Sequence, residues 1–183
     1  QLEPLKVSQA FYKGPFDYTG PNPMVFYKKV PAADGTIQIV PVASVPIDPA
    51  LTDVFLLFLK GSAAASEAPH PPLRIVSMNN QLDEFPKGGY RIYNLSDYEV
   101  GGIFSDQRFT IPANSSKTID LNGTDHVDVR IHFSTKVDGE WISQINTRWR
   151  HDEQTRNIVF VTDDPNSRHP KLKLKTITQY FTE

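Results

Sequence analysis

The residues that could carry chemistry in this chain are its histidines and carboxylates, and two short stretches bring both kinds together. One is His151-Asp152-Glu153, and the other is Asp163-Asp164 with His169. Carboxylate oxygens are the ligands that hard cations prefer, and a histidine nearby could complete such a site. The internal repeat described below would bring both loops to one end of a folded unit. Solvated turn residues are the simpler interpretation, so the sequence predicts no metal site here.

The histidines as a group have no spacing typical of metal ligands. His126 and His132 could share one face of a strand, but six residues at roughly 3.3 Å each hold them about 20 Å apart, too far for one ion. The five histidines are His70, His126, His132, His151 and His169.

Motifs for nucleophilic catalysis and phosphate binding are absent from the sequence. There is no cysteine, which excludes a disulfide framework, a thiolate zinc site and a thiol nucleophile. Neither a Gly-x-Ser-x-Gly elbow nor a Ser-x-x-Lys element occurs. We therefore predict no catalytic residue, no cofactor and no enzymatic activity. The alternative is a hydrolase or metal-dependent enzyme whose site is built from scattered loops.

The two tryptophans favour either sugar binding or core packing. Counting along a strand puts Trp141 and Trp149 on one face with Ile145, and sugars stack on exposed aromatic faces. The repeat places the aliphatic residues Ile37 and Val45 at equivalent positions, which favours a buried role for both indoles. The opposite face forms a polar strip that could accept a glycan or a protein, and its residues are Gln144, Asn146, Arg148 and Arg150.

The candidate residues named above lie on or beside strands that belong to a repeated pattern in the sequence. Asp34-Gly35 recurs as Asp138-Gly139 after 104 residues (138 − 34 = 104), and the apolar run 54–57 recurs at 158–161 (158 − 54 = 104). Internal repeats of this kind indicate duplicated structural units. If the two copies of the repeat align in register, Ile37 and Trp141 should both point inward, as should Val45 and Trp149.

The apolar runs without alternation predict the most buried strands. We expect 54–59 and 158–161 to be covered on both faces, each at the centre of its unit. Replacing Phe58 or Phe160 by alanine should then cost about 3 to 5 kcal/mol.

The fold class predicted is all-β, because period-two alternation recurs and helical periodicity does not. Fifteen prolines and frequent turn residues separate many short strands. We expect two tandem immunoglobulin-like β-sandwich units, 1–80 and 81–183, the first reduced to fewer strands. One composite β-sandwich that shares strands between the halves is the alternative.

Charge and hydropathy limit the kinds of binding partner that the sequence predicts. Lysine plus arginine number 19 and aspartate plus glutamate number 21, giving a net charge of −2, so neither nucleic acid nor an anionic membrane is indicated as a partner. No segment approaches the roughly 18 apolar residues of a membrane span.

The first residue of the chain suggests its location. The chain begins with Gln1, as a mature protein does after a signal peptide is removed, so we expect export to the periplasm, cell surface or medium.

Two stretches of the chain resemble a known group of proteins, and this resemblance also favours export. The run 85–96, which ends in Asn94-Leu95-Ser96, and the run 109–116 resemble stretches of uncharacterised secreted bacterial β-sandwich proteins of immunoglobulin-like fold. The resemblance implies an exported protein of no known activity and supplies no functional residue. We therefore expect a non-enzymatic module at the cell envelope or outside the cell that binds a protein or a polysaccharide, or a carbohydrate-binding module in particular.

Overall fold

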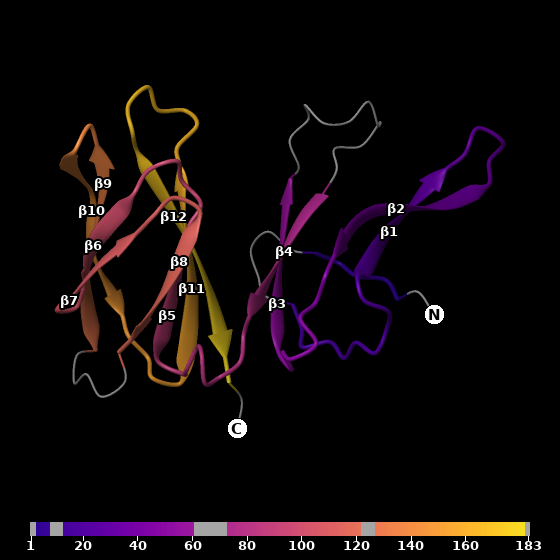
Figure 1. Cartoon of the computed structure of the whole chain (residues 1–183), viewed down its shortest axis with the longest axis horizontal. Helices are drawn as coiled ribbons and strands as arrows, with labels where there is room; N and C mark the ends of the chain where they lie inside the picture. Colours follow the sequence, from indigo (N-terminus) through magenta and orange to yellow (C-terminus); the bar gives the residue numbers. More distant parts are fainter. Residues whose placement is uncertain (1–2, 8–12, 61–72, 122–126, 182–183) are drawn as a thin grey trace. The chain divides into compact units, whose positions relative to one another are not determined.

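The computed structural model of the chain describes residues 3–7, 13–60, 73–121 and 127–181. They fall into two compact units, the first ending at Gln81 and the second beginning at Leu82. The described residues form twelve β-strands and no helix (Figure 1). The chain is therefore all-β, as its period-two alternation predicts.

The first unit contains two hairpins. Strand β1 (Met24–Pro31) pairs antiparallel with β2 (Ile37–Val45), and β3 (Val54–Lys60) pairs antiparallel with β4 (Leu73–Asn79). Within β2, Pro41 has no N–H to give to a ladder. It is accommodated because β2 lies at the edge of a two-stranded sheet and a bulge falls beside it, between Phe26 and Tyr27 of β1.

The prediction that 54–59 is a central strand, covered on both faces, is wrong. Phe55 is buried, but the other five residues of the run are only half-buried. Phe58 packs edge-to-face on Phe26 with ring centroids 5.0 Å apart. Among the described residues β3 pairs with β4 alone, so it is not a central strand. An apolar run without alternation shows that both faces are partly covered, and it does not reveal whether strands flank both edges.

The second unit is a β-sandwich of two four-stranded sheets (Figure 1). One sheet has the order β12-β11-β5-β8, with β5 and β11 parallel, and the other has the order β10-β9-β6-β7. The strands are β5 (Gly89–Asn94), β6 (Val100–Phe104), β7 (Gln107–Ile111), β8 (Ser115–Asp120), β9 (Asp128–Val137), β10 (Glu140–Arg150), β11 (Thr155–Asp163) and β12 (Leu172–Tyr180).

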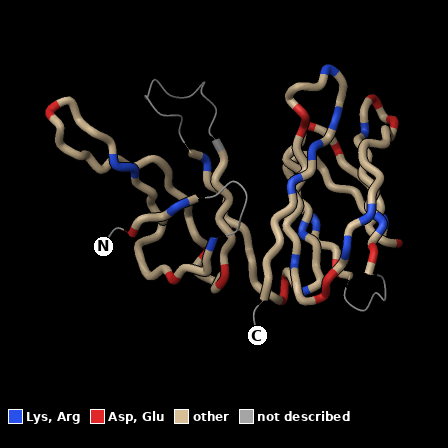
Figure 2. The backbone as a smooth tube through the Cα atoms, turned by 180° about the vertical axis from the view of Figure 1, so that it is seen from behind, with Lys and Arg blue, Asp and Glu red and all other residues tan. Residues whose placement is uncertain are grey.

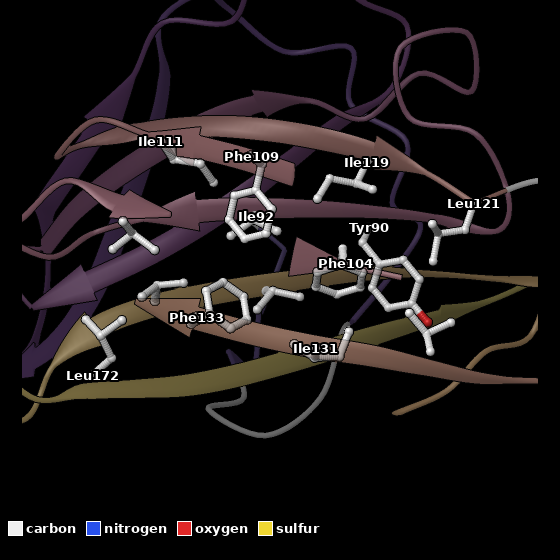
Figure 3. Packing of buried hydrophobic residues seen from close by; sticks show 14 residues of the cluster. Tyr90, Ile92, Phe104, Phe109, Ile111, Ile119, Leu121, Ile131, Phe133 and Leu172 are labelled. Carbon is white, nitrogen blue, oxygen red and sulfur yellow. The ribbon is translucent and has the colours of Figure 1, made fainter. Parts of the chain in front are cut away.

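The core of the second unit lies between its two sheets (Figure 3). From 127 to 133 apolar and polar residues alternate, which predicts that Val127, Val129, Ile131 and Phe133 all point inward. The last three are fully buried in β9, whereas Val127 precedes the strand and is 60% exposed, so the prediction is wrong for that residue. The aromatic rings interlock edge-on, with Phe133 5.5 Å from Phe109 and 6.3 Å from Phe104. Strand β11 is buried continuously from Thr155 to Val161, so the prediction for 158–161 is confirmed.

Both predicted Asp-Gly turns join strands, but their geometry differs. Asp138 and Gly139 both have positive φ, 50° and 88°, and directly link Val137 to its pairing partner Glu140. Positive φ at both central residues is the type I′ pattern, whose twist suits a two-residue hairpin. In the hairpin of the first unit the turn is the longer loop that joins Pro31 to its partner Ile37, and within that loop Gly35 alone has positive φ (81°).

The different turns give the two hairpins different registers. Met24 pairs with Val45, whereas the residue 104 positions later, Asp128, pairs with Arg150 and not with Trp149. At an offset of 104 residues the cross-strand pairing of the two hairpins therefore differs by one residue, so the predicted alignment in register is wrong. Ile37 is 68% exposed, so its predicted inward orientation is wrong, and Val45 is buried as predicted.

Candidate functional site

An open cleft of about 660 Å³ lies in the second unit, where the two sheets part between their edge strands β10 and β12. Aromatic, aliphatic, hydroxyl and amide groups share its walls, so it offers both an apolar surface and hydrogen-bonding partners. The lining residues are Tyr90, Ile145, Thr147, Arg148, Trp149, Arg150, Asn157, Leu174 and Thr176.

Trp149 forms the aromatic wall of the cleft. It pairs across the strands with the fully buried Val129, so its side chain enters the space between the sheets. There the indole stacks on Tyr90 with centroids 6.3 Å apart and meets Phe104 edge-on at 5.7 Å. These contacts fix one side of the ring, and the half-buried remainder faces the cleft. The result is a preorganised flat apolar surface.

Tyr90 and His151 lie behind this wall. Tyr90 is 1% exposed, and its hydroxyl is 3.3 Å from Nδ1 of His151, which is itself 7% exposed. Burial, with a smaller contribution from the charge of Asp152, raises the pKa of Tyr90 to about 12. The phenol is therefore neutral through the physiological range. Nε2 of His151 is buried without a hydrogen-bond partner among the described residues.

Asn157 supplies an amide to the cleft. Its Oδ1 accepts a hydrogen bond from Oγ1 of Thr178 at 2.7 Å, which fixes the orientation of the amide group. The amide nitrogen donates no hydrogen bond to the part of the chain that is described, so it can serve a ligand. Thr147 and Thr176 add hydroxyl groups from the two edge strands.

Trp141 does not share the face of Trp149, which corrects the sequence prediction. The register of β10 shifts between Ser143 and Ile145, and this bulge reverses the alternation that counting from 141 to 149 assumes. Trp141 is 44% exposed on the outer face of the sheet. A Cβ on Gly101 would lie 2.8 Å from the Trp141 ring, so glycine there lets the indole lie close to the sheet.

The predicted polar strip on β10 is reduced to three residues. Gln144 lies at the bulge, where its side chain donates to Oγ1 of Thr135 and to the carbonyl of Pro170 and accepts from the amide of Leu172. It thereby links β10 to the neighbouring strand and to the start of β12. Asn146, Arg148 and Arg150 are exposed.

The two acid-histidine stretches lie at opposite ends of β11, which contradicts the prediction that they share one end. Residues 151–154 precede β11 and 164–171 follow it (Figure 1). At about 3.3 Å per residue, the strand between them holds the two loops roughly 30 Å apart. They cannot form a joint site.

The three aspartates in these stretches have structural partners. Asp164 forms an ion pair with Lys173 at 2.8 Å, and the pKa of its carboxyl is lowered by that bond and by the amide of Asn166. Asp163 accepts from the amide of Asp97, and Asp152 accepts from the amide of Gln154. Glu153 and His169 are exposed.

No group of three histidine or acidic side chains able to hold a metal occurs among the described residues. His70 and His126 lie outside that part of the chain. His132 is 3.0 Å from the hydroxyl of Ser143 across the strands.

The cleft combines residues that sequence reasoning singled out with others that it missed. Trp149, Arg148 and Arg150 were candidates, whereas Tyr90, Asn157 and Thr176 come from three further strands. Alternation shows that each points to one face of its strand. Which strands face each other is a property of the topology, and no motif marks it.

Membrane helices are also missing from the described residues, none of which form a helix long and apolar enough for a crossing. Comparison with protein-family models, curated proteins and solved structures gives no match. The resemblance to secreted immunoglobulin-like proteins therefore stays a prediction.

Proposed function

We propose that the chain is a non-enzymatic binding module that holds a saccharide in the cleft between β10 and β12. The observation that carries this proposal is the flat indole of Trp149, held from behind by Tyr90 and Phe104 and open to the cleft. A pyranose ring has an apolar face of C–H groups and an equatorial rim of hydroxyls. An aromatic wall surrounded by amide and hydroxyl groups complements both features.

The composition of the walls favours binding over hydrolysis. Glycoside hydrolysis generally needs two carboxyl groups on either side of the scissile bond. The lining residues offer amide, hydroxyl and neutral phenol groups, and no acidic residue is among them. A location at the cell envelope or outside the cell, an immunoglobulin-like relationship and an origin by duplication are further parts of this proposal that remain predictions.

The test uses the two tryptophans as separate reporters. In a Trp141→Phe variant the only indole is Trp149, so a saccharide that stacks on it should change the intensity and wavelength of its fluorescence. The same saccharide should leave Trp141 unchanged in a Trp149→Phe variant. A glycan array supplies the ligands for this titration.

A second variant blocks the cleft without disturbing the core. Thr176 is exposed and lines the cleft, so Thr176→Phe should fill it and abolish the fluorescence response. Thr110→Phe, at an exposed position on β7, is the matched control and should bind normally. Binding that survives Thr176→Phe would contradict the proposed site, and release of shortened sugars from a bound oligosaccharide would contradict a non-enzymatic role.

A further inference from the structure

The outer face of the β10-β9-β6-β7 sheet, on the side away from Trp149 and the core, is strongly basic. Residues that alternate with buried Val129 and its inward neighbours in β9 point to this face, as do their cross-strand partners. The basic residues found there are all exposed and are Arg108, Arg130, Lys136, Arg148 and Arg150.

Few acidic residues balance these cations. Asp128 lies opposite Arg150, and Glu99, just before β6, forms an ion pair with Lys136 at 3.4 Å. Five basic against two acidic residues leave an excess of three positive charges (5 − 2 = 3) on one face of a chain whose net charge is −2. Figure 2 shows basic segments on the strands of this unit and acidic segments mostly near its loops. Such a face is complementary to an extended anionic ligand.

Trp141 lies flat on the same face. Its ring reaches from β10 across β9 to β6, where a Cβ on Gly101 would lie 2.8 Å from it. The two strands are two strand spacings apart, about 10 Å, so the indole must lean over the sheet. Ser134 points outward beneath this path but is only 8% exposed, and Gly101 is buried too. With 44% of its surface exposed, Trp141 therefore forms a flat apolar platform backed by the sheet.

A pair of arginines lies further along this face. Arg148 is directly opposite Arg130 in the strand register. Like charges so placed destabilise the pairing, and an oxyanion bound between the two guanidinium groups would relieve the repulsion. Six residues of β9 separate Arg130 from Lys136, the cross-strand partner of Trp141, which is about 20 Å at 3.3 Å per residue. Only an extended chain of several units can contact the platform and the arginine pair together.

We infer that the outer face of this sheet binds an acidic polysaccharide, one ring of which stacks on Trp141 while carboxylate or sulfate groups further along bind Arg130 and Arg148. The apolar face of a pyranose complements the indole, and planar guanidinium groups bind oxyanions in a bidentate manner. This is a second site that goes beyond the function proposed for the cleft, because Trp149 points to the other face of the sheet.

Single-stranded nucleic acid is the other polyanion that combines stacking with cations. Its binding sites typically stack successive bases on several aromatic side chains along a basic groove. Among the described strand positions of the outer face, Trp141 is accompanied by one other ring, the imidazole of His132, which lies 3.0 Å from the hydroxyl of Ser143. A single platform about 20 Å from the arginine pair fits a polysaccharide better.

The experiment uses Trp149→Phe, a variant in which Trp141 is the only indole and its fluorescence reports on the outer face. Hexagalacturonate, a heparin hexasaccharide and neutral xylohexaose are titrated into it. We expect an acidic hexasaccharide to change the fluorescence, with an affinity that falls as salt is added, and xylohexaose to bind more weakly. The two acidic probes distinguish carboxylate from sulfate recognition. Galacturonic acid itself should bind weakly, because it cannot span the site.

Further substitutions in the same variant test the two parts of the site. Arg130→Gln and Arg148→Gln should each weaken the acidic probe by about tenfold, as for loss of a charged hydrogen bond. Lys117→Gln, at an exposed position on β8 of the other sheet, is the matched control and should not. Gly101→Ala should push the indole away from the sheet and weaken binding without removing a charge.

Arg148→Glu separates binding from folding. It converts the like-charged pair with Arg130 into an opposite-charged one, so resistance to denaturant should be unchanged or higher while the acidic probe is lost. Equal binding of xylohexaose, or binding that the arginine variants do not alter, would overturn the acidic ligand. Tighter, arginine-dependent binding of an oligothymidylate would overturn the polysaccharide in favour of nucleic acid. Loss of the Trp141 response in Thr176→Phe, which fills the cleft, would overturn the separate outer site, whereas failure at Trp141 alone leaves the cleft proposal standing.

Discussion

Tyr90 joins the core of the second unit to its cleft. Its ring packs between Phe104 and Trp149, with centroids 4.7 and 6.3 Å away, and its hydroxyl contacts His151. A phenol can remain in such a place only while it is neutral, because removing its proton would leave a charge in an apolar setting. The pKa of Tyr90, raised to about 12, expresses that cost.

The stability of the protein should therefore fall in alkaline solution through Tyr90. The unfolded chain releases this proton at about pH 10, whereas the folded protein keeps it until about pH 12. The contribution is thus fully present below pH 10 and lost between pH 10 and 12. Denaturant unfolding across this interval should show a shallower decline for Tyr90→Phe than for the unmodified chain. Tyr180→Phe, at a position 78% exposed, should leave the decline unchanged, and an equal decline in all three proteins would contradict the assignment.

Gln144 is the extra residue of a β-bulge that could not be recognised from the sequence. The stretch 141–149 can be counted as one alternating strand, and nothing in it marks an extra residue. The bulge is stabilised by contacts that become visible only in three dimensions, with Thr135 of β9 and with Pro170 and Leu172 near the start of β12. Placing the two tryptophans on one face was wrong for this reason.

Asn94 illustrates the opposite case, a motif whose meaning is structural. It is fully buried, and its side-chain amide donates to the carbonyls of Tyr98, Ile111 and Pro112. Its Oδ1 accepts from the hydroxyl and the amide of Ser96. The Asn94-Leu95-Ser96 run therefore ties the loop after β5 to the end of β7, which explains those residue types without a ligand.

At the scale of elements, local patterns predicted strands well and their surroundings poorly. Each Asp-Gly pair lies in the turn of a hairpin, and the alternation of 129–133 marks buried and exposed faces correctly, because both signals arise within one strand or turn. Burial of a whole strand depends on which strands flank it. The apolar runs in β3 and β11 look alike in sequence, yet β11 lies between β5 and β12 whereas β3 pairs with β4 alone.

Alanine substitutions should reveal this difference between the units. Phe133 is fully buried against Phe104 and Phe109, so Phe133→Ala should lower the free energy of unfolding of the second unit by about 4 kcal/mol. Phe58 is half-buried, and Phe58→Ala should cost the first unit only about 1 to 2 kcal/mol, below the 3 to 5 expected for a central strand. Chemical denaturation measures both values. Equal costs would restore β3 as a core strand.

At the scale of the whole molecule, the two units differ in how much apolar surface they bury. Only Val45, Phe55 and Met78 are buried hydrophobic residues among the described positions of the first unit, whose two sheets have two strands each. The second unit buries a continuous cluster between four-stranded sheets. Two-stranded sheets are marginal without a packed face, so the first unit should be the less stable of the two.

Unfolding of the full chain should therefore proceed in two steps. Both tryptophans belong to the second unit, so their fluorescence reports on that unit alone, whereas far-ultraviolet circular dichroism reports on the strands of both. Circular dichroism should begin to change at a lower denaturant concentration than fluorescence, because transitions that do not coincide indicate separate cooperative units. Phe58→Ala should move the first step only, and Phe133→Ala should shift the fluorescence transition to lower denaturant. Coincident transitions in the unmodified chain, moved together by either substitution, would mean that the halves fold as one composite sandwich.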